Sequence, residues 1–124
     1  MIRGSVSPDL EATIPLVVLG VAGSGQEIQA VLDTGFTGEL TLPLPIINSL
    51  GMTWLGTEEG ILADGSVEVF HVYSTSVMWD GQTRSIEVDA IEADPLVGMK
   101  LLRGHSLQMD VIPGGNVTVA RLAT

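Results

Sequence analysis

Residues 31–38 read Val-Leu-Asp-Thr-Gly-Phe-Thr-Gly, and this stretch decides how the rest of the chain is interpreted. An apolar run typical of a buried strand ends in an acid, Asp33, a hydroxyl, Thr34, and a glycine, Gly35. A carboxylate directly after a buried strand costs solvation free energy unless it is hydrogen-bonded or has a chemical task. Gly35 allows a sharp turn that brings its N–H near the carboxylate, and the Thr34 hydroxyl can reach a partner loop.

The residues before this stretch predict a β-hairpin. Residues 13–21 are apolar and rich in Val, Leu and Ile, which predicts a strand buried on both faces or nearly so. Residues 22–25 contain two glycines and predict a turn. Residues 26–32 alternate and predict a second strand that ends at Asp33. The residues expected on its buried side are Ile28, Ala30 and Leu32.

Downstream of the stretch, turn signals recur about every ten residues between strand-like runs. A helix is predicted from Pro45, which suits a first helical position, to Leu50, before Gly51. Tight turns are predicted at Asp64-Gly65 and at Asp80-Gly81. Further strands are expected over residues 39–42, 52–59, 67–79, 83–91, 96–98, 106–112 and 116–122, with a second short helix over 99–103.

The pattern as a whole predicts one all-β domain over residues 1–124, a closed or nearly closed β-barrel with one or two short helices. Residues 1–12 carry Gly, Ser and Pro and predict an irregular or edge segment. Large side chains on both faces of residues 67–73 predict a strand that is packed on both sides.

The composition narrows the classes of partner. Five basic and fifteen acidic residues give a formal net charge of −10, which disfavours nucleic acid and anionic membrane surfaces as partners. The chain has no cysteine, so it has neither disulfides nor a thiolate nucleophile. No apolar run approaches the roughly 20 residues of a membrane span. The first residues lack the basic-then-apolar order of a signal peptide, and we expect a cytoplasmic protein.

Four features, in order along the chain, resemble the retropepsin-like (clan AA) aspartic peptidases of retroviruses and bacteria. Leu32-Asp33-Thr34-Gly35 resembles the catalytic loop, and Ala63-Asp64-Gly65 lies where the flap hairpin is expected. Leu96-Val97-Gly98 resembles the element that supports the catalytic loop, and the short helix and strand after it complete the pattern. The resemblance covers most of the chain, and residues 33–42 are more similar to the bacterial branch of single-domain enzymes than to the viral one.

The resemblance implies an aspartic endopeptidase that works as a homodimer without a metal or other cofactor. Its catalytic residues would be Asp33, Thr34 and Gly35. Hydrolysis without a metal or covalent nucleophile needs one carboxylate to activate water and another to donate a proton. Since the chain holds a single Asp-Thr-Gly, a two-fold axis would supply the second carboxylate.

An extended peptide would be the substrate, bound as an added strand. The flap residues that would close over it are Leu62, Ala63, Asp64, Gly65 and Ser66. The support beneath the catalytic loop would be Leu96, Val97 and Gly98.

Some positions depart from the viral pattern, and other interpretations stay open. Phe36 and Thr37 stand where viral members carry a small residue and then Asp or Ser, which leaves the substrate subsites undefined. Residues 116–122 are expected to serve as an exposed edge strand for dimerisation. A peptide-binding or assembly module that hydrolyses nothing is the alternative function, and a monomeric small-ligand barrel is a third.

Several polar residues have simpler interpretations. Asp33 alone would suit an Asx-turn at the end of a hairpin. The isolated histidines, His71 and His105, predict no zinc site and are interpreted as structural or surface residues. The loose acidic group lacks the spacing of a calcium loop and is interpreted as solvated surface. Its members are Asp89, Glu92 and Asp94. Trp54 is interpreted as a packing residue of a strand.

Overall fold

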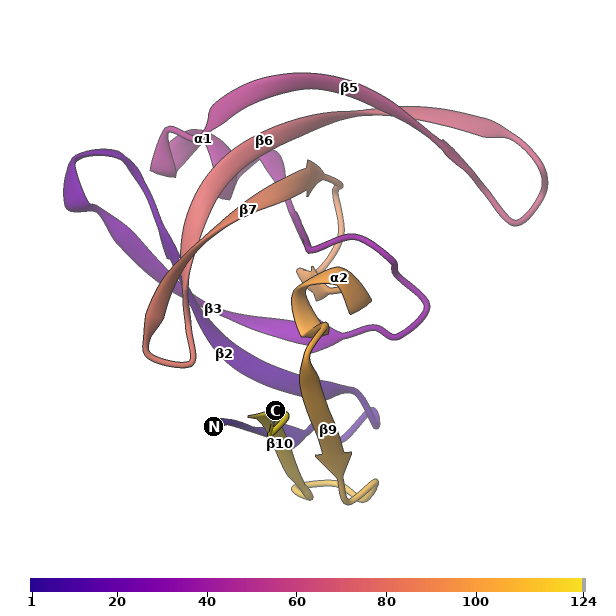
Figure 1. Ribbon diagram of the computed structural model, residues 1–124. Helices are drawn as coiled ribbons and strands as arrows, with labels where there is room; N and C mark the ends of the chain where they lie inside the picture. Colours follow the sequence, from indigo (N-terminus) through magenta and orange to yellow (C-terminus); the bar gives the residue numbers. More distant parts are fainter. Residues whose placement is uncertain (124) are drawn as a thin grey trace.

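Ten strands pair into one sheet in the computed structural model, which describes residues 1–123 (Figure 1). Their order across the sheet is β5-β6-β7-β4-β8-β3-β2-β1-β10-β9, and β6 also pairs with β2. The strands are β1 (Ile2–Val6), β2 (Ala12–Leu19), β3 (Gly25–Leu32), β4 (Leu40–Leu42), β5 (Thr53–Ile61), β6 (Val67–Trp79), β7 (Gln82–Ala90), β8 (Leu96–Val97), β9 (His105–Met109) and β10 (Asn116–Arg121). The helices are α1 (Leu44–Leu50) and α2 (Met99–Leu102), with one 3-10 turn at Val21–Gly23.

This arrangement confirms a mostly β, single-domain fold with two short helices. The additional pairing of β2 with β6 folds the sheet back on itself, and it joins Val17 with Met78, Val18 with Val77 and Leu19 with Ser76. The result is a folded ten-stranded sheet, and its closure into a barrel stays a prediction.

The core lies between the folded halves of the sheet and is built from alternating apolar side chains. On β3 the buried residues are the predicted Ile28, Ala30 and Leu32. On β2 every second residue is fully buried and the residues between them are partly buried, which agrees with the prediction of a strand buried on both faces or nearly so. The buried members there are Ala12, Ile14, Leu16 and Val18. A strand with one core face and one partly covered face is usual for antiparallel pairing.

Glycines at positive φ mark the helix end and the turns that the sequence predicts. Gly51 ends α1 in the left-handed conformation at φ 64°. Asp80 and Gly81 both have positive φ, at 51° and 81°, and join β6 to β7 as a two-residue hairpin turn. Side chains at Ile86 and Val88 of β7 alternate into the core as expected.

The hairpin of β5 and β6 is the most prominent feature of the fold, since its far end projects beyond the rest of the domain (Figure 1). β5 runs to Ile61 and so includes Gly60, where the sequence predicted that the strand had already ended. The ladder between β6 and β7 begins only at Val72 paired with Asp89. Residues 67–71 therefore have no β7 neighbour, and the prediction that they are packed on both faces is wrong.

Both chain ends form strands inside the sheet, which corrects two predictions. β1 lies between β2 and β10, so residues 2–6 are neither irregular nor an edge, whereas residues 7–11 form the turn that leads into β2. A Cβ at Gly4 would stand 1.9 Å from the Thr13 carbonyl oxygen, so this glycine is required for close approach to β2 and is not a turn signal. β10 lies between β1 and β9, so residues 116–122 are not an exposed edge; the edges are β5 and β9.

Candidate active site

The Asp33 loop begins directly at the end of β3. The Asp33 N–H donates to the Val97 carbonyl at 2.9 Å, which continues the pairing of β3 with β8. The Gly35 N–H donates to Asp33 Oδ1 at 2.9 Å, and the Phe36 N–H donates to the Asp33 carbonyl at 3.2 Å. Among residues 1–123, Gly35 is the sole hydrogen-bond donor to this carboxylate, which is half-buried. One carboxylate oxygen, Oδ1, is thereby held by the backbone of the loop.

β8 lies between the strand that enters the loop and the strand that leaves it. It pairs in parallel with β3 and antiparallel with β4, so the predicted support residues Leu96 and Val97 lie beside both ends of the loop. Thr41 of β4 is buried, and its Oγ1 accepts a hydrogen bond from the Leu96 N–H at 3.0 Å. This buried pairing limits how far the loop ends can move.

Gly98 contacts the loop so closely that no side chain fits there. A Cβ at this position would stand 2.2 Å from the Gly38 carbonyl oxygen and 2.6 Å from the Phe36 ring. The Gly98 N–H donates to the Glu39 carbonyl at 3.0 Å, and the Met99 N–H donates to the Phe36 carbonyl at 2.8 Å. The third predicted support residue thus lies against the outer half of the loop, where Phe36 fills space that a smaller residue would leave open.

The predicted flap residues form the turn at the tip of the β5–β6 hairpin. The Leu62 N–H donates to the Ser66 carbonyl, and the Gly65 N–H donates to the Leu62 carbonyl. The N–H and the hydroxyl of Ser66 both donate to Asp64 Oδ1, at 2.9 and 2.6 Å. The Ser66 hydroxyl is the main cause that lowers the pKa of Asp64. Ala63 completes this turn, whose hydrogen bonds all lie within residues 62–66.

Asp89 is not a solvated surface residue as predicted. Its neighbours along the sheet are Val72 of β6 and Thr41 of β4, and it is half-buried. Burial, followed by repulsion from Glu58, Glu87 and Glu39, raises the pKa of Asp89 to about 6.

Glu92 is exposed, as predicted, and it also makes a structural contact. Its Oε1 accepts the Leu44 N–H at 3.0 Å, at the first residue of α1. A carboxylate there satisfies one of the free N–H groups at a helix start.

The two histidines each accept a hydrogen bond from a tryptophan. Trp54 Nε1 donates to His71 Nδ1 at 3.1 Å, and Trp79 Nε1 donates to His105 Nε2 at 3.2 Å. Trp54 is 57% exposed, so it is not the packing residue that was predicted. Within residues 1–123, no group of three or more His, Asp or Glu is placed to hold a metal ion. The described part of the chain contains no helix with the length and apolarity of a membrane span.

Two cavities bear on the location of the site. One of about 410 Å³ lies beside the Asp33 loop and is bordered by Thr34. Its other lining residues are Met99, Leu102, Arg103, Gly104, His105 and Leu107. A cavity of about 450 Å³ lies away from the loop, where α1 meets the middle of β6. The first cavity adjoins the predicted catalytic residue Thr34, whereas the second has mainly hydroxyl and apolar walls.

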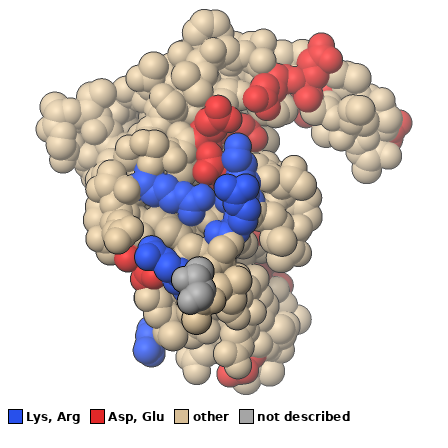
Figure 2. All heavy atoms as spheres, in the orientation of Figure 1, with Lys and Arg blue, Asp and Glu red and all other residues tan. Residues whose placement is uncertain are grey.

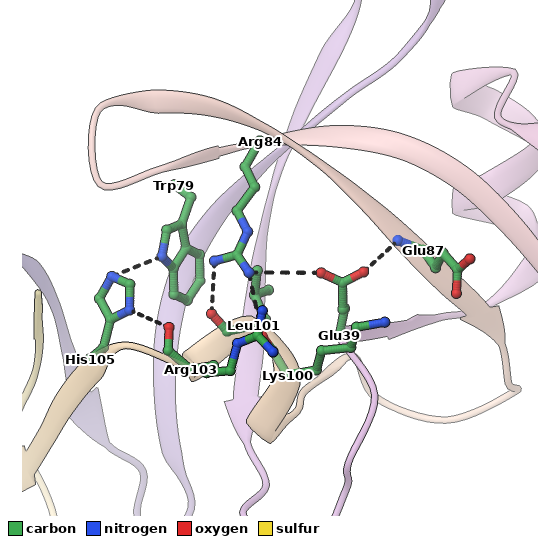
Figure 3. Close-up of polar contacts among 8 residues, drawn as sticks. All are labelled: Glu39, Trp79, Arg84, Glu87, Lys100, Leu101, Arg103 and His105. Carbon is green, nitrogen blue, oxygen red and sulfur yellow. Dashed lines mark hydrogen bonds and ion pairs between the residues drawn. The ribbon is translucent and has the colours of Figure 1, made fainter.

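Sequence reasoning missed the polar network that joins the loop to α2 and β7 (Figure 3). Its central members are Glu39 and Arg84, with Glu87 on the same strand as Arg84. The one sequence signal for this network is that basic residues are scarce: Arg84 is one of only five in the chain.

Comparison with known proteins defines the fold. The chain is similar to a solved structure described as a retropepsin-like aspartic protease from Rickettsia conorii, with a TM-score of 0.63 and 19% sequence identity. The match covers 98% of this chain and 90% of that one. No protein-family model matches the chain, and no curated protein matches it. The chain therefore has a retropepsin-like fold, and the Asp33 loop is part of that fold.

Proposed function

We propose that the protein is an aspartic endopeptidase that is active as a homodimer. The observation that carries the proposal is the Asp33-Thr34-Gly35 loop at the end of β3, in a retropepsin-like fold, with the Asp33 carboxylate held by the Gly35 N–H. A half-buried carboxylate held on one side by a backbone donor is suited to general acid–base chemistry.

The proposed chemistry needs two such carboxylates. Asp33 of one protomer acts as the base that activates a water molecule, and Asp33 of a second protomer donates a proton to the leaving group. Two carboxylates that share a proton cannot both ionise, so the pair divides into one acid and one base. The exposed Thr34 hydroxyl would hydrogen-bond across the two-fold axis, and Gly35 would maintain the turn.

Exposed apolar surface beside the loop supports a second copy at this place. Met99 is 47% exposed and adjoins Thr34 across the 410 Å³ cavity, whose wall also contains Leu102 and Leu107. A twofold contact brings the same surface patch of each protomer together, so the apolar patch of one protomer would be buried against the identical patch of the other. β10 is already paired with β1 and β9, so it has no free edge with which to pair with a second protomer.

The hairpin supports an extended peptide as the substrate. Ile61 pairs with Val67, and Val69 follows two residues later on the same face; these side chains are 79%, 59% and 60% exposed. Apolar side chains gathered on a projecting hairpin usually have a binding partner. In the proposed mechanism residues 62–66 close over the peptide, exclude water and bind its backbone.

Asp33→Asn provides the direct test, because it keeps the size of the side chain and removes the acid. We expect wild-type protein to cleave denatured protein or a peptide library best between about pH 3 and about pH 6, and the variant to lose at least about 1000-fold in kcat. Asp9→Asn, at an exposed turn, is the matched control and should cleave like wild type. Equal turnover by wild type and Asp33→Asn would refute the proposal.

Peptide binding without cleavage by the wild type would favour the non-catalytic module instead. Sedimentation adds the oligomeric state, for which the proposal requires a dimer under the conditions of cleavage.

A further inference from the structure

We propose that Arg84 is a positioning residue for the Asp33 loop, which it holds in place by clamping α2 and Glu39 together. The expected effect on kcat rests on the proposed function. The expected effect on the position of the loop rests on the structure alone. Basic side chains gather at the centre of one face, directly beside acidic ones (Figure 2). Three of the five basic residues lie at this place, namely Arg84, Lys100 and Arg103 (Figure 3).

Arg84 extends from β7 to the C-terminal end of α2. Its Nη1 donates to the Leu101 carbonyl at 3.0 Å, and its Nη2 donates to the Lys100 carbonyl at 3.4 Å. The last carbonyls of a helix have no partner within the helix. A four-residue helix such as α2 is not stable by itself, so its orientation depends on contacts of this kind.

The opposite end of α2 contacts the outer half of the Asp33 loop. The Met99 N–H donates to the Phe36 carbonyl at 2.8 Å, and the Lys100 N–H donates to the Gly38 carbonyl at 3.2 Å. The loop is thus hydrogen-bonded to one end of a helix whose other end is held by Arg84. A rotation of α2 would therefore move residues 36–38, which directly follow the Asp-Thr-Gly triplet.

Glu39 completes the connection between Arg84 and the loop. Its Oε2 lies 3.9 Å from Arg84 Nη2, and its Oε1 accepts the Glu87 N–H at 2.9 Å. Its own carbonyl accepts the Gly98 N–H at 3.0 Å. The Glu39 side chain is 10% exposed and that of Arg84 is 31% exposed, so the pair is less screened by solvent than a surface ion pair.

The guanidinium is suited to this place because its donors are fixed in a planar fork. The two terminal nitrogens of Arg84 contact two backbone carbonyls and one carboxylate. The single ammonium group of a lysine, on a flexible side chain, does not reproduce this arrangement. The backbone of the loop moves little while this fork is intact. Small misplacement of reacting groups lowers the rate of the chemical step far more than it lowers substrate affinity.

The test compares Arg84→Met and Arg84→Lys with wild type, and uses Arg3→Met as the matched control. Arg3 is an exposed arginine of β1, so its loss should leave activity unchanged. We expect Arg84→Met to lower kcat at least about tenfold with KM within about twofold, and Arg84→Lys to lie between it and wild type. Glu39→Gln keeps an acceptor for the Glu87 N–H and removes the charge, and we expect a smaller loss of kcat.

A second readout does not depend on catalysis. In Arg84→Met, the amide hydrogens of Gly98, Met99 and Lys100 should exchange with solvent at least about tenfold faster than in wild type. Amides of the β2–β3 ladder should be unaffected.

Unchanged kcat and unchanged exchange in Arg84→Met would overturn the inference, and so would a loss of activity that lies only in KM or in dimerisation. An inactive wild type would refute the proposed function instead, and faster exchange at α2 would then still support Arg84 as the residue that positions the loop. If Arg84→Met fails to fold, Arg84→Lys decides the question by the same two readouts.

Discussion

Replacing Asp89 by Asn should stabilise the protein at neutral pH and leave its stability unchanged in acid. Burial is the main cause that raises the pKa of Asp89 from 3.8 to about 6, and the charges of Glu58, Glu87 and Glu39 add to it. The folded state therefore binds the proton more tightly than the unfolded state does. Asn has nearly the same size and no charge, so it removes this penalty without leaving a cavity.

The sign and size of the effect follow from linkage. Between pH 3.8 and about 6 the folded chain holds more protons than the unfolded chain, so the free energy of unfolding falls as the pH rises through this range. The penalty is complete above about pH 6 and absent below about pH 4. A shift of about two pH units corresponds to about 3 kcal/mol if it is fully expressed. Because Asp89 is only half-buried, screening by solvent lowers our expectation to about 1 kcal/mol.

Urea unfolding followed by tryptophan fluorescence can measure this difference, with both proteins at one fixed concentration because the proposed dimerisation would contribute to stability. We expect Asp89→Asn to be about 1 kcal/mol more stable than wild type at pH 7 and equal to it at about pH 3.5. Asp9→Asn, in an exposed turn, should change neither value. A gain that is equal at both pH values, or no gain at pH 7, would refute the assignment of the raised pKa to Asp89.

Two further substitutions test the support of the Asp33 loop. Gly98→Ala would place a Cβ 2.2 Å from the Gly38 carbonyl oxygen, and we expect it to lower the free energy of unfolding by about 2–4 kcal/mol and to abolish activity. Gly25→Ala, where the nearest atom is 3.6 Å away, is its control, and wild-type stability of Gly98→Ala would contradict the observed packing. Thr41→Val removes the acceptor of the Leu96 N–H and should cost about 1–3 kcal/mol in urea unfolding, whereas Thr41→Ser should cost less; equal losses in the two variants would argue against the hydrogen bond.

Local patterns were the most reliable part of the sequence for predicting the fold. The alternation in residues 26–32 and the glycines at positions 51 and 81 depend on the conformation of a few neighbouring residues, and the structure confirms them. The β5–β6 hairpin was also predicted, but its turn is centred on Ala63 and Asp64 and not on Asp64 and Gly65, and its exposure was not predicted. β7 follows β6 after a two-residue turn and is the shorter strand, so its ladder with β6 reaches only Val72 and leaves residues 67–71 without a β7 neighbour.

The chain ends show why other predictions were wrong. Gly4 was interpreted as a sign of irregular structure, yet it is the point at which β1 comes close to Thr13. The same residue type favours a turn or permits a close approach, and only the neighbouring strand distinguishes the two. Residues 116–122 were correctly predicted as a strand and wrongly as an edge, because the position of a strand in a sheet depends on all of its partners.

For the candidate site, the sequence alone pointed to the Asp33-Thr34-Gly35 triplet and the Leu96-Val97-Gly98 element, since each is a short run of residues that can be recognised without knowledge of its neighbours in space. Three features became visible only in the folded chain: β8 lies between the two strands of the loop, Gly98 touches Gly38, and Arg84 is hydrogen-bonded to α2. These contacts join residues that are far apart along the chain. They form because burial of the core brings the segments together, and a hydrogen bond or close contact between them leaves no periodic signal in either segment.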